Sequence, residues 1–173
     1  GASPRQIMER VLRNCRSYAY SFTPDAGNLL FVGGTGLGKT FLSACIARTV
    51  ADNGYSVMYE SAGHLFANLE RAKFSGDETA RRESDKYLAC DLLIVDDLGT
   101  EMTTAFVQSA LYQIINGRIL ERKPTILSTN LKVDERNNEI AKRYSPQIAS
   151  RIEGEYQIMP FFGKDIRLLK KGL

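Results

Sequence analysis

The octapeptide GGTGLGKT occupies residues 33–40, and it decides the fold of this chain. It fits the pattern G-x-x-x-x-G-K-[ST], with Gly33, Gly38, Lys39 and Thr40 at the fixed positions. Glycines allow the backbone to wrap with its N–H groups pointing inward, which makes a nest for anions. A lysine and a threonine at these positions are suited to contact the β/γ-phosphates and Mg²⁺. The octapeptide therefore predicts a phosphate-binding loop.

The sequence on both sides of the loop supports this prediction. Residues 29–32 (LLFV) are typical of a buried strand, and after the loop apolar residues recur at helical spacing until Asn53-Gly54. Strand, loop and helix in this order are the context expected of a P-loop NTPase. The residues expected to bind the nucleotide are Gly34, Thr35, Gly36, Leu37, Gly38, Lys39, Thr40 and Phe41.

Length and composition indicate one globular domain in 173 residues, with 43% hydrophobic and 25% charged content. No apolar run approaches the roughly 18 residues of a membrane span, and no signal-peptide pattern opens the sequence. The three cysteines have no C-x-x-C spacing and are expected to be reduced in a cytoplasmic protein. Residues 1–3 are typical of a cloning remnant, so a natural N-terminal region is expected to be missing.

The rest of the chain alternates between expected helices and strands. Helices are predicted over residues 5–20, 64–74, 78–88 and 106–119, and another begins at Ser145-Pro146 and ends near Gly154. Further strands are predicted over residues 57–60, 92–95, 125–128 and 156–161. This alternation favours an α/β fold, in which helices cover a five-stranded parallel sheet and ligands bind at the carboxyl ends of the strands.

Two acids follow the expected strand at residues 92–95. A buried strand that delivers a carboxylate at its carboxyl end is what a P-loop enzyme needs to hold Mg²⁺, so we assign this role to Asp96. Asp97 is then placed to orient the attacking water. The alternative is that the acidic pair is a solvated strand end or a helix cap.

A polar triplet, Ser128-Thr129-Asn130, follows the fourth strand. We expect Asn130 to hydrogen-bond the γ-phosphate or the attacking water. The alternative is an ordinary asparagine in a turn after a strand.

In these stretches the chain resembles the AAA+ ATPases of the DnaC/DnaI/IstB type, the group of bacterial helicase loaders. The matching segments are NLLFVGGTGLGKTFLS, DLLIVDDLGTE, PTILSTN and SRIEGEYQIMPFFGKDIRLL. The resemblance implies ATP and Mg²⁺ as cofactors, a Walker B role for Asp96 and Asp97, and a sensor 1 role for Asn130. It further implies that Arg151 is an arginine finger acting on a neighbouring protomer, and that Arg167 is the sensor 2 arginine.

The resemblance also implies an architecture and partners. Residues 1–27 would form an N-terminal segment with a short helix, and residues 28–173 an AAA+ ATPase domain without a C-terminal helical lid. The expected activity is slow, Mg²⁺-dependent ATP hydrolysis, stimulated by self-association into a ring or spiral. The expected partners are single-stranded DNA and a replicative helicase, which would bind through the missing N-terminal region; no membrane is expected.

Alternatives to helicase loading remain open. An IstB-like transposition helper shares the same motifs, and a small-molecule P-loop kinase or a nucleotide-dependent switch without turnover would share the P-loop. The region 64–88 corresponds to helices that loaders use against DNA, with Phe74 and Tyr87 available for base stacking. Five bases are balanced there by five acids, so a solvated face laced with ion pairs is the alternative; the residues are Arg71, Lys73, Arg81, Arg82 and Lys86 against Glu70, Asp77, Glu78, Glu83 and Asp85.

Overall fold

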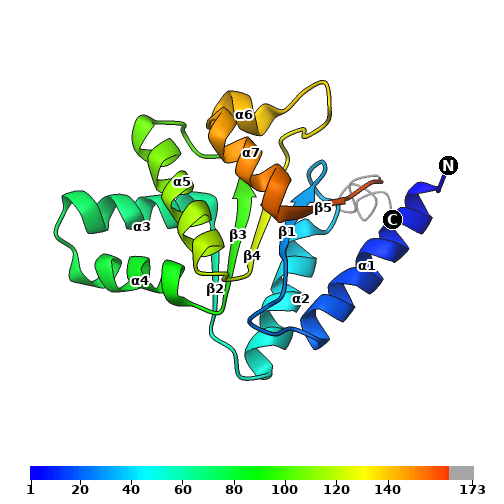
Figure 1. The fold of residues 1–173 in the computed structure, drawn as a ribbon, viewed down its shortest axis with the longest axis horizontal. Coiled ribbons are helices and arrows are strands. Elements are labelled where there is room, and N and C mark those ends of the chain that lie inside the picture. Colours follow the sequence, from blue (N-terminus) through cyan, green and yellow to red (C-terminus); the bar gives the residue numbers. More distant parts are fainter. Residues whose placement is uncertain (164–173) are drawn as a thin grey trace, which may run out of the picture.

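The computed structural model describes residues 1–163, which are built around a sheet of five strands in the order β2-β3-β4-β1-β5 (Figure 1). The strands are β1 (Asn28–Val32), β2 (Val57–Ser61), β3 (Leu92–Leu98), β4 (Thr125–Thr129) and β5 (Tyr156–Pro160). Every neighbouring pair is parallel. The predicted five-stranded parallel sheet is confirmed.

The apolar runs of the central strands follow from their position. Strands β1, β3 and β4 have a neighbour on each side and helices over each face, so both sets of alternating side chains are buried. One set, including Leu29, Phe31 and Ile94, packs against α1 (Pro4–Tyr20) and α2 (Lys39–Asp52). The other set, including Leu30 and Val95, packs against the remaining helices.

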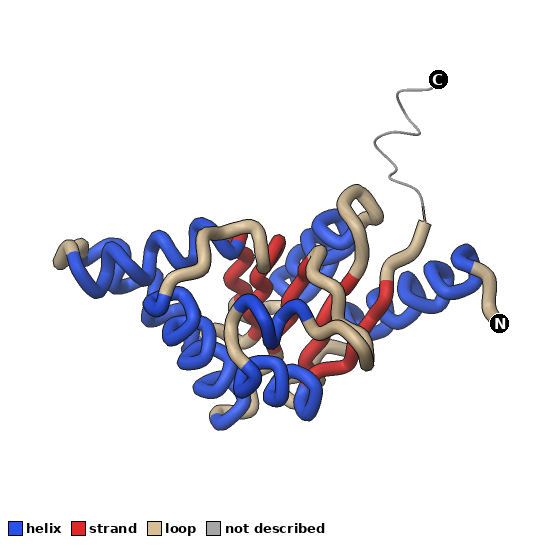
Figure 2. Tube along the Cα trace, turned by 90° about the horizontal axis from the view of Figure 1, so that it is seen from above, coloured by secondary structure: helices blue, strands red, loops and turns tan. Residues whose placement is uncertain are grey.

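Those remaining helices are α3 (Ala62–Phe74), α4 (Glu78–Ala89), α5 (Ala105–Leu120), α6 (Glu139–Arg143) and α7 (Pro146–Glu155). Figure 2 shows the strands lying between the two groups of helices, as a doubly covered sheet requires. Within the described part of the chain, no helix is long and apolar enough to cross a membrane.

Side-chain caps fix most of the helix starts. The Ser145 side chain accepts a hydrogen bond from the N–H of Ile148 and Pro146 occupies the first turn of α7, as predicted. Ser3 and Gln6 form a reciprocal capping box at the start of α1. The last residue of the supposed cloning remnant therefore takes part in the fold.

Helix α6 was not predicted. It is only five residues long, which is too short for an apolar period to show in the sequence. Its cap is visible afterwards, because the Asn138 side chain accepts a hydrogen bond from the N–H of Ala141.

Candidate nucleotide-binding site

The phosphate-binding loop joins β1 to α2 at the carboxyl edge of the sheet. Gly36 and Gly38 have φ of 77° and 97°, in the region that glycine enters without steric cost. Position 33 requires glycine for a steric reason, because a Cβ there would lie 2.5 Å from the carbonyl oxygen of Phe161. The backbone that follows β5 passes directly against the loop and excludes any side chain at this position.

Lys39 reaches back over the loop from the first residue of α2. Its Nζ donates hydrogen bonds to the carbonyl oxygens of Gly33 at 2.6 Å and Gly34 at 2.7 Å. Burial lowers the pKa of the Lys39 ammonium, whereas the carboxylates of Asp97 and Asp96 raise it. The partly desolvated Lys39 ammonium thus lies at the loop, where a bound nucleotide would place its phosphate oxygens.

The carboxylate of Asp96 is the best-connected polar group of the site. Its Oδ2 accepts hydrogen bonds from Thr40 Oγ1 at 2.8 Å and from the Tyr59 hydroxyl at 2.9 Å, and its Oδ1 accepts one from the Ser128 hydroxyl. Thr40 and Asp96 were expected to meet. Tyr59 was not assigned to the site from the sequence, because nothing distinguishes a tyrosine in an edge strand from a packing residue.

The oxygen atoms around Asp96 fit a magnesium site. The Thr40 hydroxyl and the Asp96 carboxylate are hard donors in contact with each other, and Mg²⁺ binds such oxygens together with phosphate oxygens of its substrate. These residues are therefore the ones that would hold the ion.

The strand predicted over residues 92–95 continues through both acids, because β3 spans Leu92–Leu98, but Asp97 is not in a regular extended conformation. Its φ is 61°, and the pairing of β3 with β4 shifts register between Val95 and Leu98. The Asp97 N–H donates to Ser128 Oγ at 3.0 Å instead of continuing the regular ladder. This irregularity leaves the Asp97 side chain exposed while that of Asp96 is buried, so the two acids point to different surroundings.

Asn130 follows β4 and meets the phosphate-binding loop. Its Nδ2 donates to Thr35 Oγ1 at 3.0 Å, although the two residues lie far apart in the sequence. The structure thus brings the loop, the acidic end of β3 and the polar end of β4 to one edge of the sheet. Phe41, at the other limit of the loop, is 70% exposed on the first turn of α2.

Arg151 lies on α7, where its Nη2 donates to Asn116 Oδ1 of α5 at 2.7 Å. An ordinary surface ion pair with Glu153 or Glu155 would be the alternative to a catalytic role, and Arg151 forms no such pair within the described residues. Its hydrogen-bond partner belongs to α5 and not to the loop. Arg167, the expected sensor 2 residue, lies outside the described residues.

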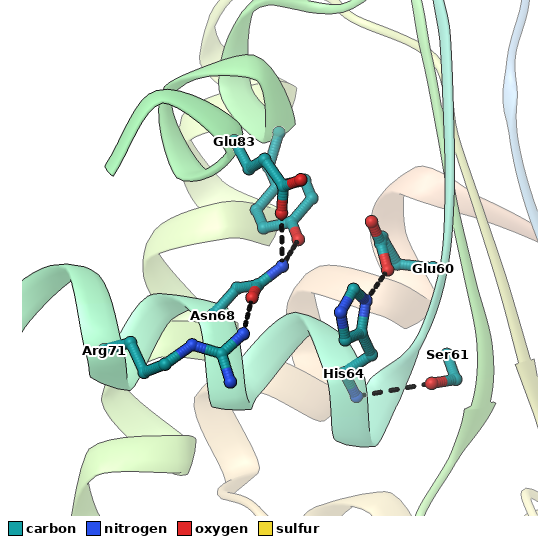
Figure 3. A network of polar contacts seen from close by, with 7 residues as sticks. Glu60, Ser61, His64, Asn68, Arg71 and Glu83 are labelled. Atoms are coloured by element: carbon teal, nitrogen blue, oxygen red, sulfur yellow. Dashed lines mark hydrogen bonds and ion pairs between the residues drawn. The ribbon is translucent and has the colours of Figure 1, made fainter. Parts of the chain in front are cut away.

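The hairpin of α3 and α4 is held together by a buried asparagine. Asn68 is 1% exposed, and its Nδ2 donates to Glu83 Oε2 at 2.7 Å (Figure 3) and to the Tyr87 hydroxyl at 2.9 Å. Arg71 donates to the Asn68 Oδ1. Tyr87 is fully buried, so it is a core residue and is not available to stack on a base.

The single histidine of the chain sits at the start of the same hairpin. Its backbone N–H donates to the Ser61 side chain, which caps α3, and its ring contacts Glu60 at the end of β2 (Figure 3). His64 is therefore a residue of the helix start. Phe74, at the far end of α3, is 65% exposed and packs its ring against Phe106.

The class of protein is defined by three features together. The parallel sheet is covered on both faces, a phosphate-binding loop follows its first strand, and polar groups follow β3 and β4. The fold is that of a P-loop protein of the AAA+ type. The sequence matches the family described as IstB-like ATP binding protein over residues 3–170, so the chain belongs to this family of ATP-binding proteins.

Two kinds of name occur among curated proteins similar to this chain. The replicative helicase loader DnaC of Buchnera aphidicola subsp. Baizongia pistaciae is 26% identical over 125 residues, which cover 71% of this chain and 50% of that protein. A Sinorhizobium fredii protein named as an insertion sequence ATP-binding protein is 27% identical over 145 residues, which cover 83% of this chain and 57% of the relative. The chain thus spans about half the length of the curated relatives it matches.

Solved structures share the fold. A crystal structure of the DnaC helicase loader superimposes with a TM-score of 0.77 at 23% identity, over 90% of each chain. The replication initiator DnaA bound to AMPPCP and single-stranded DNA superimposes with a TM-score of 0.72 at 24% identity, over 90% of this chain and 46% of that one. These similarities establish the architecture.

Proposed function

We propose that this chain is a Mg²⁺-dependent ATPase domain that helps to load a replicative helicase onto single-stranded DNA. The observation that carries the ATPase part is the meeting of Lys39, Thr40 and Asp96 at one edge of the sheet. Family membership supports ATP as the nucleotide. Relatives named as helicase loaders support the biological role.

In this proposal the loop amides and the Lys39 ammonium bind the phosphates. Phosphate oxygens would compete for Nζ with the two loop carbonyls that it now contacts. Thr40 and Asp96 would hold Mg²⁺, which neutralises charge that develops on the phosphates during transfer. Positioning and electrostatic stabilisation then account for most of the catalysis, as they do in other phosphoryl transfers.

Hydrolysis also needs a group that orients water. The exposed Asp97 lies at the irregular end of β3, where its N–H donates to Ser128 of β4, and the Asn130 amide donates to Thr35 of the loop. We assign Asp97 to the attacking water and Asn130 to the γ-phosphate or the same water. Arg151 would act on ATP bound to a neighbouring copy in a ring or spiral, which explains why it lies away from the loop.

A second candidate is a helper ATPase for transposition, which the insertion sequence relative favours. The ATPase site would be the same, so only the partner distinguishes the two. The deciding experiment gives the full-length protein either the replicative helicase with a single-stranded DNA circle or the matching transposase with its DNA ends. ATP-dependent loading of the helicase supports the first function, and stimulation of strand transfer supports the second.

The ATPase activity is tested separately, by measuring turnover with and without single-stranded DNA. Phosphate release that requires Lys39 supports a hydrolase. ADP formed only when a small-molecule acceptor is present would indicate a kinase, and tight ATP binding without turnover would indicate a nucleotide-dependent switch.

A further inference from the structure

Tyr59 reaches the Asp96 carboxylate because of the register between two neighbouring strands. Ser61 of β2 pairs with Asp96 of β3, and Tyr59 pairs with Ile94. Residues two apart on a strand lie on the same face, so Tyr59 and Asp96 are diagonal neighbours on the face covered by α2. Adjacent strands lie about 4.8 Å apart and rise about 3.3 Å per residue, so such neighbours in a parallel pair are about 8 Å apart, a gap that a tyrosine spans and a short side chain does not.

The contact joins an otherwise unassigned strand to the proposed metal site. The Tyr59 hydroxyl donates to Oδ2 at 2.9 Å, the same oxygen that accepts from Thr40 Oγ1 at 2.8 Å. Ser128 holds the other oxygen. The Asp96 carboxylate thus accepts hydrogen bonds from residues of α2, β2 and β4. Among these three bonds, the one from Tyr59 comes from β2, the edge strand next to β3.

We propose that Tyr59 is a positioning residue for Mg²⁺ binding, which holds the Asp96 carboxylate in the orientation that the metal site needs. This inference rests on the proposed Mg²⁺-dependent ATPase function. The Thr40 hydroxyl would have to contact both Asp96 and the ion, whereas the Tyr59 hydroxyl donates its hydrogen bond to Asp96. Tyr59 therefore maintains the orientation of Asp96 independently of what Thr40 contacts.

The competing explanation is purely structural, since a half-buried hydroxyl also needs a hydrogen-bond partner. The two explanations differ in what they predict for Tyr59→Phe, which keeps the ring and removes only the hydroxyl. A structural role lowers thermal stability and leaves the Mg²⁺ requirement unchanged. A positioning role raises the Mg²⁺ concentration needed, while nucleotide binding without metal stays the same.

The test titrates a fluorescent ATP analogue into wild type and Tyr59→Phe, first in EDTA and then over a range of Mg²⁺ concentrations. Because Tyr59 acts on the ion only through Asp96, only part of the energy of its hydrogen bond should affect metal binding. The half-saturating Mg²⁺ concentration should rise by about three- to tenfold, with affinity in EDTA within about twofold of wild type. The matched control is Tyr20→Phe, whose side chain is 69% exposed on α1 and should behave as wild type.

A second readout does not depend on nucleotide fluorescence or on turnover. In wild type, adding Mg²⁺ to nucleotide-saturated protein should raise the thermal unfolding midpoint, and in Tyr59→Phe this increment should be smaller at the same Mg²⁺ concentration. An unchanged half-saturating concentration together with an unchanged increment would overturn the role of Tyr59. If wild type itself shows no response to Mg²⁺, the proposed ATPase function is wrong and the inference falls with it.

Discussion

Thr40 and Asp96 are 56 residues apart in the sequence, and their side chains meet in a hydrogen bond of 2.8 Å. The bond joins the first turn of α2 to the carboxyl end of β3, so the two protein donors proposed for Mg²⁺ are already adjacent in the protein alone. Preformed oxygen donors reduce the reorganisation that metal binding requires.

Lys39→Ala should weaken Mg-ATP binding by roughly ten- to a hundredfold and leave the fold intact. The ammonium compensates phosphate charge that the loop amides neutralise only in part, and a charge-assisted hydrogen bond contributes about 1.5–3 kcal/mol. Calorimetric titration measures the change. Lys86→Ala removes an equivalent charge from an exposed position on α4 and serves as the control. Equal affinities of wild type and Lys39→Ala would remove Lys39 from the site.

Asp97→Asn should retain nucleotide and lose hydrolysis, whereas Asp96→Asn should mainly weaken the response to Mg²⁺. The acids are separated by the irregular end of β3, which buries Asp96 among hydroxyl donors and exposes Asp97. Asparagine tolerates the positive φ of 61° at position 97, so this variant should fold normally. Parallel measurements of nucleotide affinity and turnover check the division of roles, and equal loss of binding in both variants would contradict it.

Much of this arrangement could be predicted because it depends on local patterns. The loop glycines, the apolar run before Asp96 and the Ser145-Pro146 helix start are each short signals with one dominant structural meaning. Parallel topology then brings strand ends to a common edge, which is why Asn130 was expected near the loop and is found there.

The residues that were missed depend on contacts between distant segments. Tyr59 reaches Asp96 only through the register of β2 with β3, and no sequence period reports register. The positive φ of Asp97 arises where β3 shifts its pairing with β4, and aspartate is no strong signal for it. Arg118 carried no prediction, because one arginine within the helix expected at residues 106–119 has no distinguishing local pattern, yet it is 1% exposed.

Arg118→Met should lower the free energy of unfolding by about 3 kcal/mol or more. The buried guanidinium donates to the carbonyl oxygens of Tyr87, Cys90 and Pro124 at 2.8–3.0 Å, and a methionine of similar length would leave these acceptors without that donor. Burial lowers the pKa of Arg118, in keeping with a cation surrounded by neutral partners.

Urea denaturation of wild type and Arg118→Met measures this loss of stability. The control is Arg48→Met, which removes an exposed arginine from α2 and should change the unfolding free energy by less than about 0.5 kcal/mol. If both variants are equally stable, Arg118 does not stabilise the segment between α4 and β3, because the carbonyl oxygens that it contacts would then have found other donors.

Binding to single-stranded DNA should be weak for this chain and should fall steeply with added salt. The bases of the α3–α4 hairpin are matched by acids, so few phosphates can be neutralised, and what binding exists is electrostatic. Tyr87 is buried, which leaves Phe74 as the exposed aromatic residue on the described hairpin. Fluorescence anisotropy at several salt concentrations checks this, and salt-insensitive binding that Phe74→Ala abolishes would indicate stacking instead.

Arg151 should act in trans on ATP held by a neighbouring subunit. In the single chain its guanidinium donates a hydrogen bond to Asn116 at 2.7 Å. Among residues 1–163, it forms no hydrogen bond with the phosphate-binding loop. An arginine delivered to a transferring phosphoryl group stabilises the developing charge and is worth about 10³–10⁵ in rate. A surface ion pair with Glu153 would contribute little, so Glu153→Gln should retain turnover whichever role Arg151 has.

Mixing two inactive variants distinguishes the trans role from a role within one subunit. Arg151→Ala supplies an intact phosphate-binding loop, and Lys39→Ala supplies an intact arginine. Because a productive site needs one element from each of two neighbouring subunits, mixed oligomers should regain turnover that neither variant has alone, and the gain should depend on the mixing ratio. Glu153→Gln mixed with wild type controls for dilution. If the mixture of inactive variants stays inactive under conditions in which wild type assembles and hydrolyses ATP, Arg151 does not serve a neighbouring site.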